Sequence, residues 1–442
     1  MQKSCFPASE PSKDHRRFWL PSVETYWNGK NIDDNHSGFP LFLAFLYRSV
    51  NQGEQGEEDP SHILDNILYQ YPNNVPTRLL QAFIGGIVSF MTFSRLNLNS
   101  ILSSFSWSQS HIAIETIELS DGNFIVFALK IPTFFSQNSV KSAINRAITS
   151  LKLRNESLNK KISTTEALSL VQFFNSNSYL IINTVFPSRT DDPFDFSAHP
   201  FSSSAPKSVT CLATELFVFA RGVSPCVIGS AIFSKTEFIL SEIQNPLLNL
   251  LPIFGSIAQQ MPGHEISKFD TIDIWANPSI NGWSTENRLI PMSLSIISWG
   301  SVNYYVLIKK EGDISSILES LHKLLSNGMS DFAVECENPI KEKIEGSPAA
   351  IIWPDTSSSR MSACDISTLQ RMSNIHDQFV SYPMLRELSV LSQQKYITGI
   401  MLPKIEIIVE TKPESSGKPF INDAYSRMKE LLPNLPSDLL NL

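Results

Sequence analysis

The sequence lacks the features that mark disulfide-stabilised and zinc-binding proteins. Five cysteines are spread over 442 residues, an odd number with no C-x-x-C pair among them. Scattered cysteines of this kind are typical of reduced thiols in a cytosolic protein. Basic charge is also scarce, and the formal net charge is −8. This balance argues against a nucleic-acid partner, because a general nucleic-acid binder needs a basic face to meet phosphate.

Long apolar runs are missing as well. The first twenty residues carry six charged side chains and no apolar stretch of the kind found in signal peptides, so we expect no secretory signal. No run approaches the roughly 20 apolar residues that a membrane-spanning helix needs. We therefore expect a cytoplasmic protein.

The motifs of common catalytic and nucleotide-binding sites do not occur. The sequence has no P-loop, no G-x-G-x-x-G after a strand, no H-E-x-x-H and no G-x-S-x-G. The acidic residues Glu54, Glu57, Glu58 and Asp59 lack the alternating spacing of a calcium loop. We interpret them as the solvated tip of a hairpin. The sequence therefore predicts no catalytic residue, no metal site and no cofactor.

What the chain does contain is a repeated order of strands and helices. Residues 39–47 and 63–72 are apolar, aromatic-rich runs on either side of the acidic connector, which predicts a β-hairpin. After Pro72 the apolar residues recur at spacings of three and four, which predicts an amphipathic helix. These residues are Leu79, Leu80, Phe83, Ile84, Ile87, Val88 and Met91.

Three more strands and two helices complete the first predicted unit. The strands are expected at 101–108, 111–119 and 123–131, with a turn at Asp121-Gly122, and the helices at 139–153 and 164–175. Thr164 or Thr165 is the expected N-cap of the last helix. Three consecutive hairpin-linked strands favour an α+β layered fold over a parallel, doubly wound sheet.

The same order of elements recurs after a Pro- and Ser-rich stretch. The second unit is predicted to contain a lead-in helix (209–220), a hairpin (226–243), a helix (246–260) that Pro252 kinks or delays, three strands (271–276, 292–299, 302–309) and a helix capped by Asp313. The third unit offers a strand (349–353), a helical zone (365–380), a hairpin (396–410) and a last helix (421–432). We interpret the third unit as an incomplete or permuted copy.

These units define the predicted domain boundaries. Residues 1–38 are polar with no sustained apolar period and are predicted to form a flexible N-terminal arm. Residues 179–208 are predicted to form a linker, because the Pro- and Ser-rich stretch buries too little apolar surface to offset the entropy of ordering it. The three domains then span 39–178, 209–345 and 346–442. They are predicted to be copies of one β-β-α-β-β-β-α module, with the third copy incomplete or permuted.

The helix after Pro72 carries a further signal. Its apolar residues extend beyond one stripe, through Phe90 and Phe93, and a helix of this kind is buried on more than one side. Gly85-Gly86 lowers its helix propensity by roughly 2 kcal/mol relative to two alanines. Either the helix packs closely on its own sheet there, or the backbone of another chain approaches. We hypothesise that this helix and an open sheet edge bind a partner protein.

Two hairpins and this helix resemble a known family. The segments Leu43–Tyr47, Glu54–Asp59 and Ile67–Pro72, followed by the helix from Thr77, resemble the first longin domain of the tri-longin Rab exchange-factor subunits. These include the Ccz-type protein and the Hermansky–Pudlak syndrome type-four protein of BLOC-three. Cys226–Ser241 resembles the opening hairpin of the second longin domain in the latter. The arm before Gly38 and the compact third unit depart from the family, and the length fits a small member such as the gut granule loss protein.

The resemblance implies a fold and a set of partners. The fold is α+β, with three longin domains that are each a mostly antiparallel sheet flanked by helices. The partners are a second tri-longin subunit of the Mon, Ccz or Hermansky–Pudlak type-one kind and a Rab GTPase bound by the paired first domains. The complex would be recruited peripherally to late endosomes, lysosomes or lysosome-related organelles such as gut granules, with membrane contact only through the complex.

Polar residues and glycines of the helix from Thr77 are the expected contacts to Rab or to the second subunit. They are Arg78, Gln81, Gly85, Gly86, Ser89 and Arg95. Two other functions stay open. One is a longin-domain trafficking adaptor or planar-polarity effector scaffold without exchange activity, and the other is an enzyme whose site no motif reveals.

Overall fold

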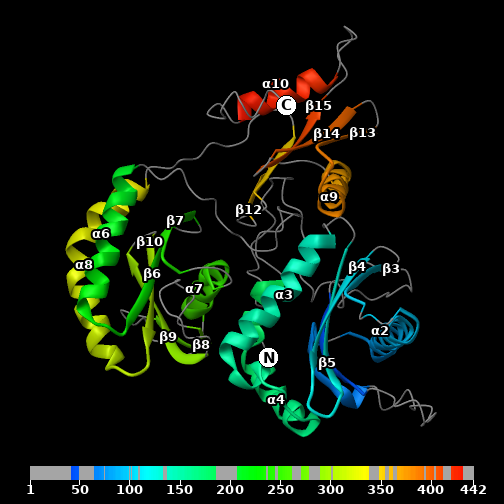
Figure 1. Cartoon of the computed structure of the whole chain (residues 1–442), viewed down its shortest axis with the longest axis horizontal. Coiled ribbons are helices and arrows are strands. Elements are labelled where there is room, and N and C mark those ends of the chain that lie inside the picture. Colours follow the sequence, from blue (N-terminus) through cyan, green and yellow to red (C-terminus); the bar gives the residue numbers. More distant parts are fainter. Residues whose placement is uncertain are drawn as a thin grey trace.

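The structure is a computed structural model of the chain, shown in Figure 1. It describes residues 41–48, 64–73, 75–98, 100, 102–107, 110–132, 137–185, 207–234, 237–243, 247–260, 270–277, 289–299, 302–337, 348–353, 358–361, 366–392, 395–402, 405–411 and 420–431. The predicted N-terminal arm, the acidic cluster at 54–59 and residues 186–206 of the predicted linker lie outside these ranges.

The first module contains five strands and two long helices. Its strands are β1 (Leu41–Tyr47), β2 (Ile67–Tyr71), β3 (Ser104–Trp107), β4 (Ser110–Glu118) and β5 (Phe124–Pro132). Helix α2 (Thr77–Leu98) follows β2, and α3 (Gln137–Arg154) follows β5. A short 3-10 helix η2 (Glu156–Asn159) then leads to α4 (Thr164–Ser176) and α5 (Ser178–Val185).

The second module repeats this order behind a lead-in helix. Its elements are α6 (Lys207–Val223), β6 (Val227–Ser234), β7 (Glu237–Ser241), η3 (Leu248–Leu250), α7 (Leu251–Gln260), β8 (Asp270–Ala276), β9 (Ile290–Trp299), β10 (Val302–Lys309) and α8 (Ile314–Glu337). Pro252 lies in the first turn of α7, so the predicted delay of this helix is confirmed. The predicted cap of α8 is also confirmed, because Asp313 Oδ1 accepts the backbone N–H of Ser316 at 3.3 Å.

The third module is a complete copy, so the prediction of an incomplete or permuted unit is wrong. Its elements are β11 (Ala349–Trp353), β12 (Ser358–Met361), α9 (Ile366–Ser381), β13 (Glu387–Ser392), β14 (Lys395–Met401), β15 (Glu406–Thr411) and α10 (Phe420–Leu431). Strands β12 and β13 are not among the elements predicted from the sequence. Both are short edge strands with polar residues in their sequences, and such strands lack the apolar run that marks a central one.

One strand order is common to all three sheets. The orders are β2-β1-β5-β4-β3, β7-β6-β10-β9-β8 and β12-β11-β15-β14-β13, and every pair of neighbours is antiparallel. The fifth strand of each module therefore lies at the centre of its sheet, with the first strand beside it. Helices flank each sheet (Figure 1). The predicted α+β class with antiparallel sheets is confirmed.

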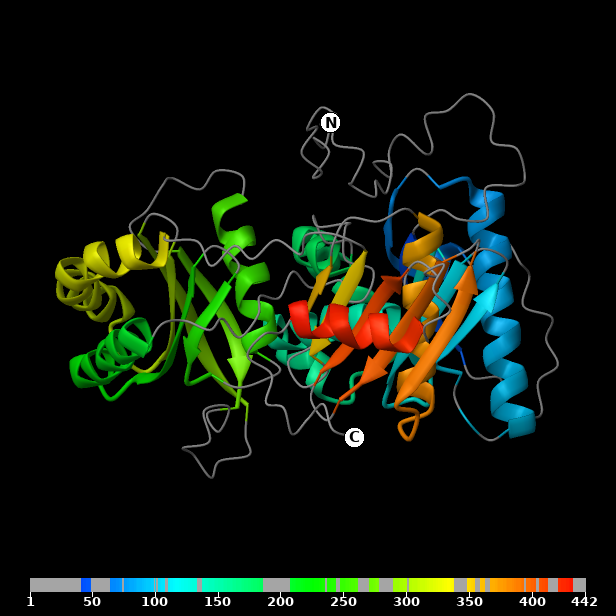
Figure 2. The same cartoon turned by 90° about the horizontal axis from the view of Figure 1, so that it is seen from above.

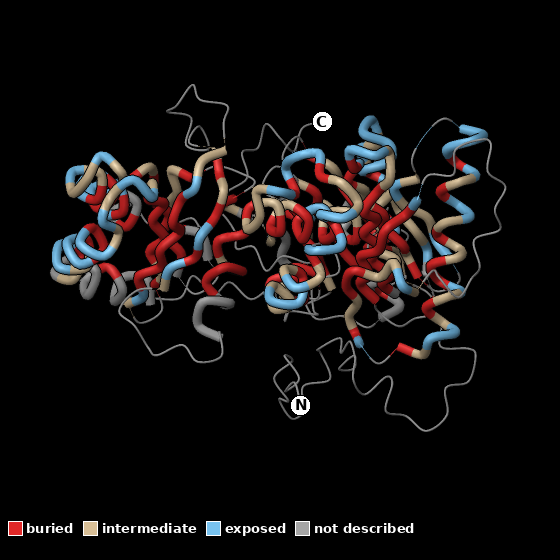
Figure 3. Tube along the Cα trace, turned by 90° about the horizontal axis from the view of Figure 1, so that it is seen from below, coloured by how far each residue is buried: buried red, intermediate tan, exposed pale blue. Residues whose placement is uncertain are grey.

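Strand β1 is apolar at every position because both faces of its sheet are covered. Leu41, Leu43 and Phe45 pack beneath α2, whereas Phe42 and Ala44 pack on the side of α3, α4 and α5. Successive side chains of a strand point to opposite faces of the sheet. A strand between two helical layers therefore needs apolar residues at both its odd and its even positions. Figure 3 shows the buried trace concentrated in the sheets and the outer turns of the helices exposed.

Helix α3 lies at the centre of the molecule, between the first sheet and the other modules (Figure 1). Two residues of the first module belong to the apolar core of the second module, namely Leu153 of α3 and Leu180 of α5. The guanidinium of Arg154 donates to the backbone carbonyl of Asp273 on β8. The first and second modules thus share a core along α3 and α5.

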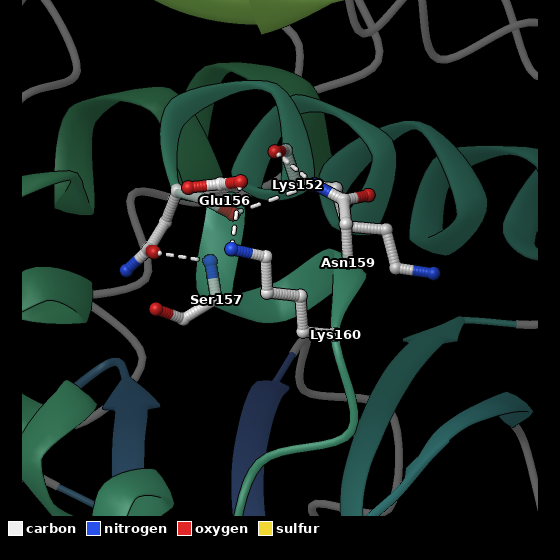
Figure 4. A network of polar contacts seen from close by, with 6 residues as sticks. Lys152, Glu156, Ser157, Asn159 and Lys160 are labelled. Atoms are coloured by element: carbon white, nitrogen blue, oxygen red, sulfur yellow. Dashed lines mark hydrogen bonds and ion pairs between the residues drawn. The ribbon is translucent and has the colours of Figure 1, made fainter. Parts of the chain in front are cut away.

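A set of polar contacts ends α3 and turns the chain toward α4 (Figure 4). Asn155 Oδ1 accepts the backbone N–H of Ser157 at 2.9 Å, and Asn159 Nδ2 donates to the carbonyl of Lys152 at 2.8 Å. Lys160 Nζ lies 2.7 Å from a carboxylate oxygen of Glu156. These bonds satisfy carbonyl and N–H groups that a helix terminus leaves without partners.

Two local predictions of the first module need correction. The N-cap of α4 is Ser163 rather than Thr164 or Thr165, and it forms a capping box with Glu166. Residues 179–185, predicted as the start of the linker, belong to α5, where Ile181 and Val185 are fully buried. The predicted turn at Asp121-Gly122 is confirmed, with Gly122 at a φ of +78°.

Candidate interaction surface on the first module

Helix α2 has one buried side and one exposed side. Its buried residues are Leu80, Phe83, Ile84, Ile87, Met91 and Ser94, which recur at spacings of three and four and pack on the sheet. The opposite side carries Ala82, Gly85, Ser89, Phe93 and Leu96. Phe93 is 58% exposed and Leu96 is 64% exposed. Large apolar side chains on an exposed helix face mark an interaction site when they cluster.

We call this exposed side, with Phe90, Leu98 and Trp107, the α2 ridge. Phe90, Leu98 and Trp107 are each more than 40% exposed. Figure 2 shows that α2 lies at the outer end of the first module, on the side away from the second module. The ridge is therefore presented outward by the chain.

Strand β3 supports one flank of the ridge. The rings of Phe90 and Phe105 have centroids 4.8 Å apart, which is a favourable distance for an aromatic pair. The ring of Trp107 lies over Gly86, where an added Cβ would be only 3.0 Å from ring atom Cζ3. Since β3 is the edge strand of its sheet, helix and edge form one continuous surface.

Contacts to the sheet fix the C-terminal part of α2. Tyr47 Oη and Thr92 Oγ1 are 3.0 Å apart and hydrogen-bonded. The guanidinium carbon of Arg95 lies 5.1 Å from the ring centroid of Phe124, which is within the range of a cation–π contact. Arg95 is nevertheless exposed, so its charge remains accessible to solvent near the C-terminal end of α2.

The six predicted site residues are spread along α2. Arg78 is exposed in the first turn, Gln81 is half-buried, and Ser89 is exposed with its hydroxyl donating to the carbonyl of Gly85 at 2.8 Å. Arg78 and Arg95 are 17 residues apart, which is about 25 Å along a helix. The structure thus brings Gly85 and Ser89 together and places the two arginines near opposite ends of α2.

The two glycines differ in their surroundings. Gly86 faces Trp107, whereas a Cβ at Gly85 would meet nothing within 4 Å. Close packing on its own sheet therefore accounts for Gly86. Gly85 faces open space on the ridge, where a second backbone can approach closely.

Helix α2 is long and apolar enough to cross a membrane by length and composition, and it is the one helix among the described residues with that property. The expectation that no such stretch exists is therefore wrong. A core helix passes the same test, and the side of α2 that holds Leu80 and Ile84 is buried on the sheet.

The chemistry of the ridge is that of binding. The sequence of α2 contains two arginines and no carboxylate, so the ridge complements a surface with an apolar centre and acidic groups at its rim. Within the described ranges, no group of three or more His, Cys, Asp or Glu side chains is arranged to hold a metal ion.

The largest exposed side chains of the ridge are not among the six predicted site residues. Phe93 and Leu96 lie outside the buried stripe of α2. Apolar residues at such positions in the sequence are the signal by which an exposed apolar surface can be predicted. Trp107 gave no such signal, because its place on the ridge depends on the pairing of β3 with β4.

No protein-family model and no curated protein matches the chain. Among solved structures, an uncharacterized protein from Mycobacterium tuberculosis aligns over 87% of this chain and 98% of its own. The sequence identity is 10% and the TM-score is 0.15. A similarity of this size carries no argument about fold or function.

Proposed function

We propose that the chain is one subunit of a heterodimeric guanine nucleotide exchange factor that activates a Rab GTPase. The observation that carries the proposal is the exposed apolar ridge on the leading one of three modules with the same strand order. Three copies of one α+β module are what a tri-longin subunit requires. The proposal therefore extends the resemblance of the two hairpins and α2 to the architecture of the whole chain.

The ridge pairs the first module with the second subunit. Phe93 and Leu96 lose their exposed apolar surface on pairing, and each Å² of such surface contributes about 25 cal/mol. Gly85 and Ser89 allow the second backbone to come near, because neither carries a large side chain. Arg78 and Arg95, near the two ends of α2, contact the Rab.

The exchange reaction needs no nucleophile and no acid. The complex binds nucleotide-free Rab more tightly than loaded Rab, and it does so by holding the switch segments away from Mg²⁺ and phosphate. Each tenfold loss of nucleotide affinity requires about 1.4 kcal/mol of differential binding. Several contacts along a surface can supply this amount, so an extended platform suits the task.

A substitution pair tests the assignment of the arginines. Arg78→Glu with Arg95→Glu should abolish Rab nucleotide release while the heterodimer still forms, because both side chains are exposed. Lys160→Glu with Lys161→Glu is a matched control, since these lysines are exposed on the same module but away from the ridge. Nucleotide release is followed by loss of a fluorescent GDP analogue.

Each outcome decides the assignment. Loss of release only in the arginine pair supports it. Unchanged release removes Arg78 and Arg95 from the Rab contacts. Loss of the heterodimer itself would place the arginines in the subunit interface instead and would contradict their assigned role.

A further inference from the structure

A carboxylate of the third module caps a helix of the first. Asp377 Oδ2 on α9 accepts the backbone N–H of Gln137 at 3.1 Å, and Oδ1 accepts the backbone N–H of Asn138 at 3.4 Å and its side-chain Nδ2 at 2.9 Å. The first N–H groups of a helix have no partner within the helix, and its N-terminus favours a negative charge. Asp377 thus serves as a cap of α3 from a position 240 residues away.

The residue before Asp377 is held in the core of the third module. His376 Nδ1 lies 2.7 Å from Oε2 of Glu406 on β15, and Glu406 is fully buried. Adjacent residues of a helix point about 100° apart. The pair that holds His376 against the sheet therefore also sets the direction of Asp377.

Close packing holds the same helix on its sheet. A Cβ at Gly399 of β14 would lie 2.4 Å from Cγ2 of Ile375 and 2.6 Å from Cε2 of Phe379. Helix α9 therefore sits on β14 at a distance that only glycine permits. Because His376 is also held in place, the position of α9 fixes the position of Asp377.

The apolar core of the third module is formed by residues of that module. Its two apolar clusters, as far as the described residues go, contain only residues between Ala349 and Leu431. The second module, by contrast, includes Leu153 and Leu180 of the first module in its core. Separation of the third module would leave those two clusters intact, whereas separation of the first two modules would split a shared core.

We propose that the third module is a detachable domain and that Asp377 is its latch, positioned by His376 and Glu406 to hold α9 on the N-terminus of α3. Opening the latch frees the first turn of α3 and releases the third module, while the first two modules stay joined. The latch also reaches the candidate surface, because Gln137 Nε2 donates to Ser104 Oγ at 2.9 Å. Ser104 begins β3, the strand that carries Trp107.

Hydrogen exchange and small-angle scattering on the full chain test the latch. Asp377→Ala should speed exchange of the amides at 137–140 about fivefold, the factor that corresponds to a helix cap worth about 1 kcal/mol. It should also increase the radius of gyration and leave exchange in β8 and α7 unchanged. Asp313→Ala is the matched control, because Asp313 caps α8 within its own module, and it should affect only the first turn of α8.

A second variant separates positioning from capping. The double change His376→Gln with Glu406→Gln keeps side chains of similar size and removes the imidazole–carboxylate contact, and it should open the latch in the same way while Asp377 is intact. Unchanged exchange at 137–140 and an unchanged radius of gyration in Asp377→Ala overturn the proposal. So does faster exchange throughout β14 and β15 in that variant, because Asp377 would then be a residue needed for the fold of its own module.

Discussion

The indole ring of Trp107 lies directly on Gly86 of α2, with ring atoms 3.0 and 3.2 Å from the position of an added Cβ. This contact fixes the edge strand β3 against α2. It explains why a residue with poor helix propensity occupies position 86, and it leaves Gly85, one residue earlier, on the open side of the helix.

The two glycines should respond differently to alanine. Gly85→Ala should raise the free energy of unfolding by up to about 1 kcal/mol, because alanine is the better helix former and the new methyl group meets no atom. Gly86→Ala should gain less or destabilise, because Trp107 must move. Urea unfolding followed by tryptophan fluorescence measures both, and equal stabilisation by the two variants would contradict the contact.

Burial of Lys130 gives stability a pH dependence. Burial lowers the pKa of Lys130 from its ordinary 10.5 to about 8, and its Nζ lies 6.0 Å from the ring centroid of Phe83 beneath α2. Between these two values the unfolded chain holds a proton that the folded protein has released. The contribution of Lys130 to stability therefore rises with pH across this window, by on the order of 3 kcal/mol.

Lys130→Met should remove this rise. The variant should be more stable than the parent chain near pH 7, where the parent buries a charge, and the two should converge toward the upper end of the window. Urea titrations at several pH values give the difference between the two chains. A difference that stays constant with pH would refute the buried charge as its source.

The close approach of α9 to its sheet predicts that position 399 tolerates no side chain larger than that of glycine. Gly399→Ala should destabilise the third module by about 1–3 kcal/mol, because the new methyl group overlaps Ile375 and Phe379. Hydrogen exchange should show the loss in β14 and β15. Gly222→Ala, where a Cβ meets no atom, is the control. Full retention of stability by Gly399→Ala would argue against the packing described.

The α2 ridge should be needed for assembly and not for folding. Phe93→Ser with Leu96→Ser should leave the unfolding free energy of the isolated chain within about 0.5 kcal/mol, since both side chains are more than half exposed. The same variant should lose the second subunit in co-purification. Val218→Ser with Phe219→Ser on α6 changes an equally exposed apolar pair and should retain it. Retention by both variants would exclude the ridge as the interface.

The sequence predicted the central strands well because they are apolar on both faces or alternate cleanly. Residues 302–309 were predicted as a strand and form β10 with the same bounds. Edge strands β12 and β13 were missed, since an edge needs fewer apolar side chains. The N-cap of α4 is Ser163 rather than the predicted Thr164 or Thr165, although the Ser163–Glu166 capping-box pattern is present in the sequence itself.

The candidate surface was predictable in part. The apolar excess of α2 indicated a second buried side, and the structure shows that side to be exposed within this chain. The contribution of Trp107 depends on pairing between β3 and β4, and the latch at Asp377 depends on contact between residues 240 apart. Contacts of that kind follow from tertiary packing, so no local pattern marks them.

Nucleotide release from a panel of Rab GTPases by the co-purified complex tests the central claim most directly. The proposal predicts that one Rab, or a small group, releases a fluorescent GDP analogue faster by several decades, and that the ridge variant at Phe93 and Leu96 abolishes the acceleration. An intact complex that accelerates release from no Rab would contradict exchange activity and favour a trafficking adaptor or scaffold.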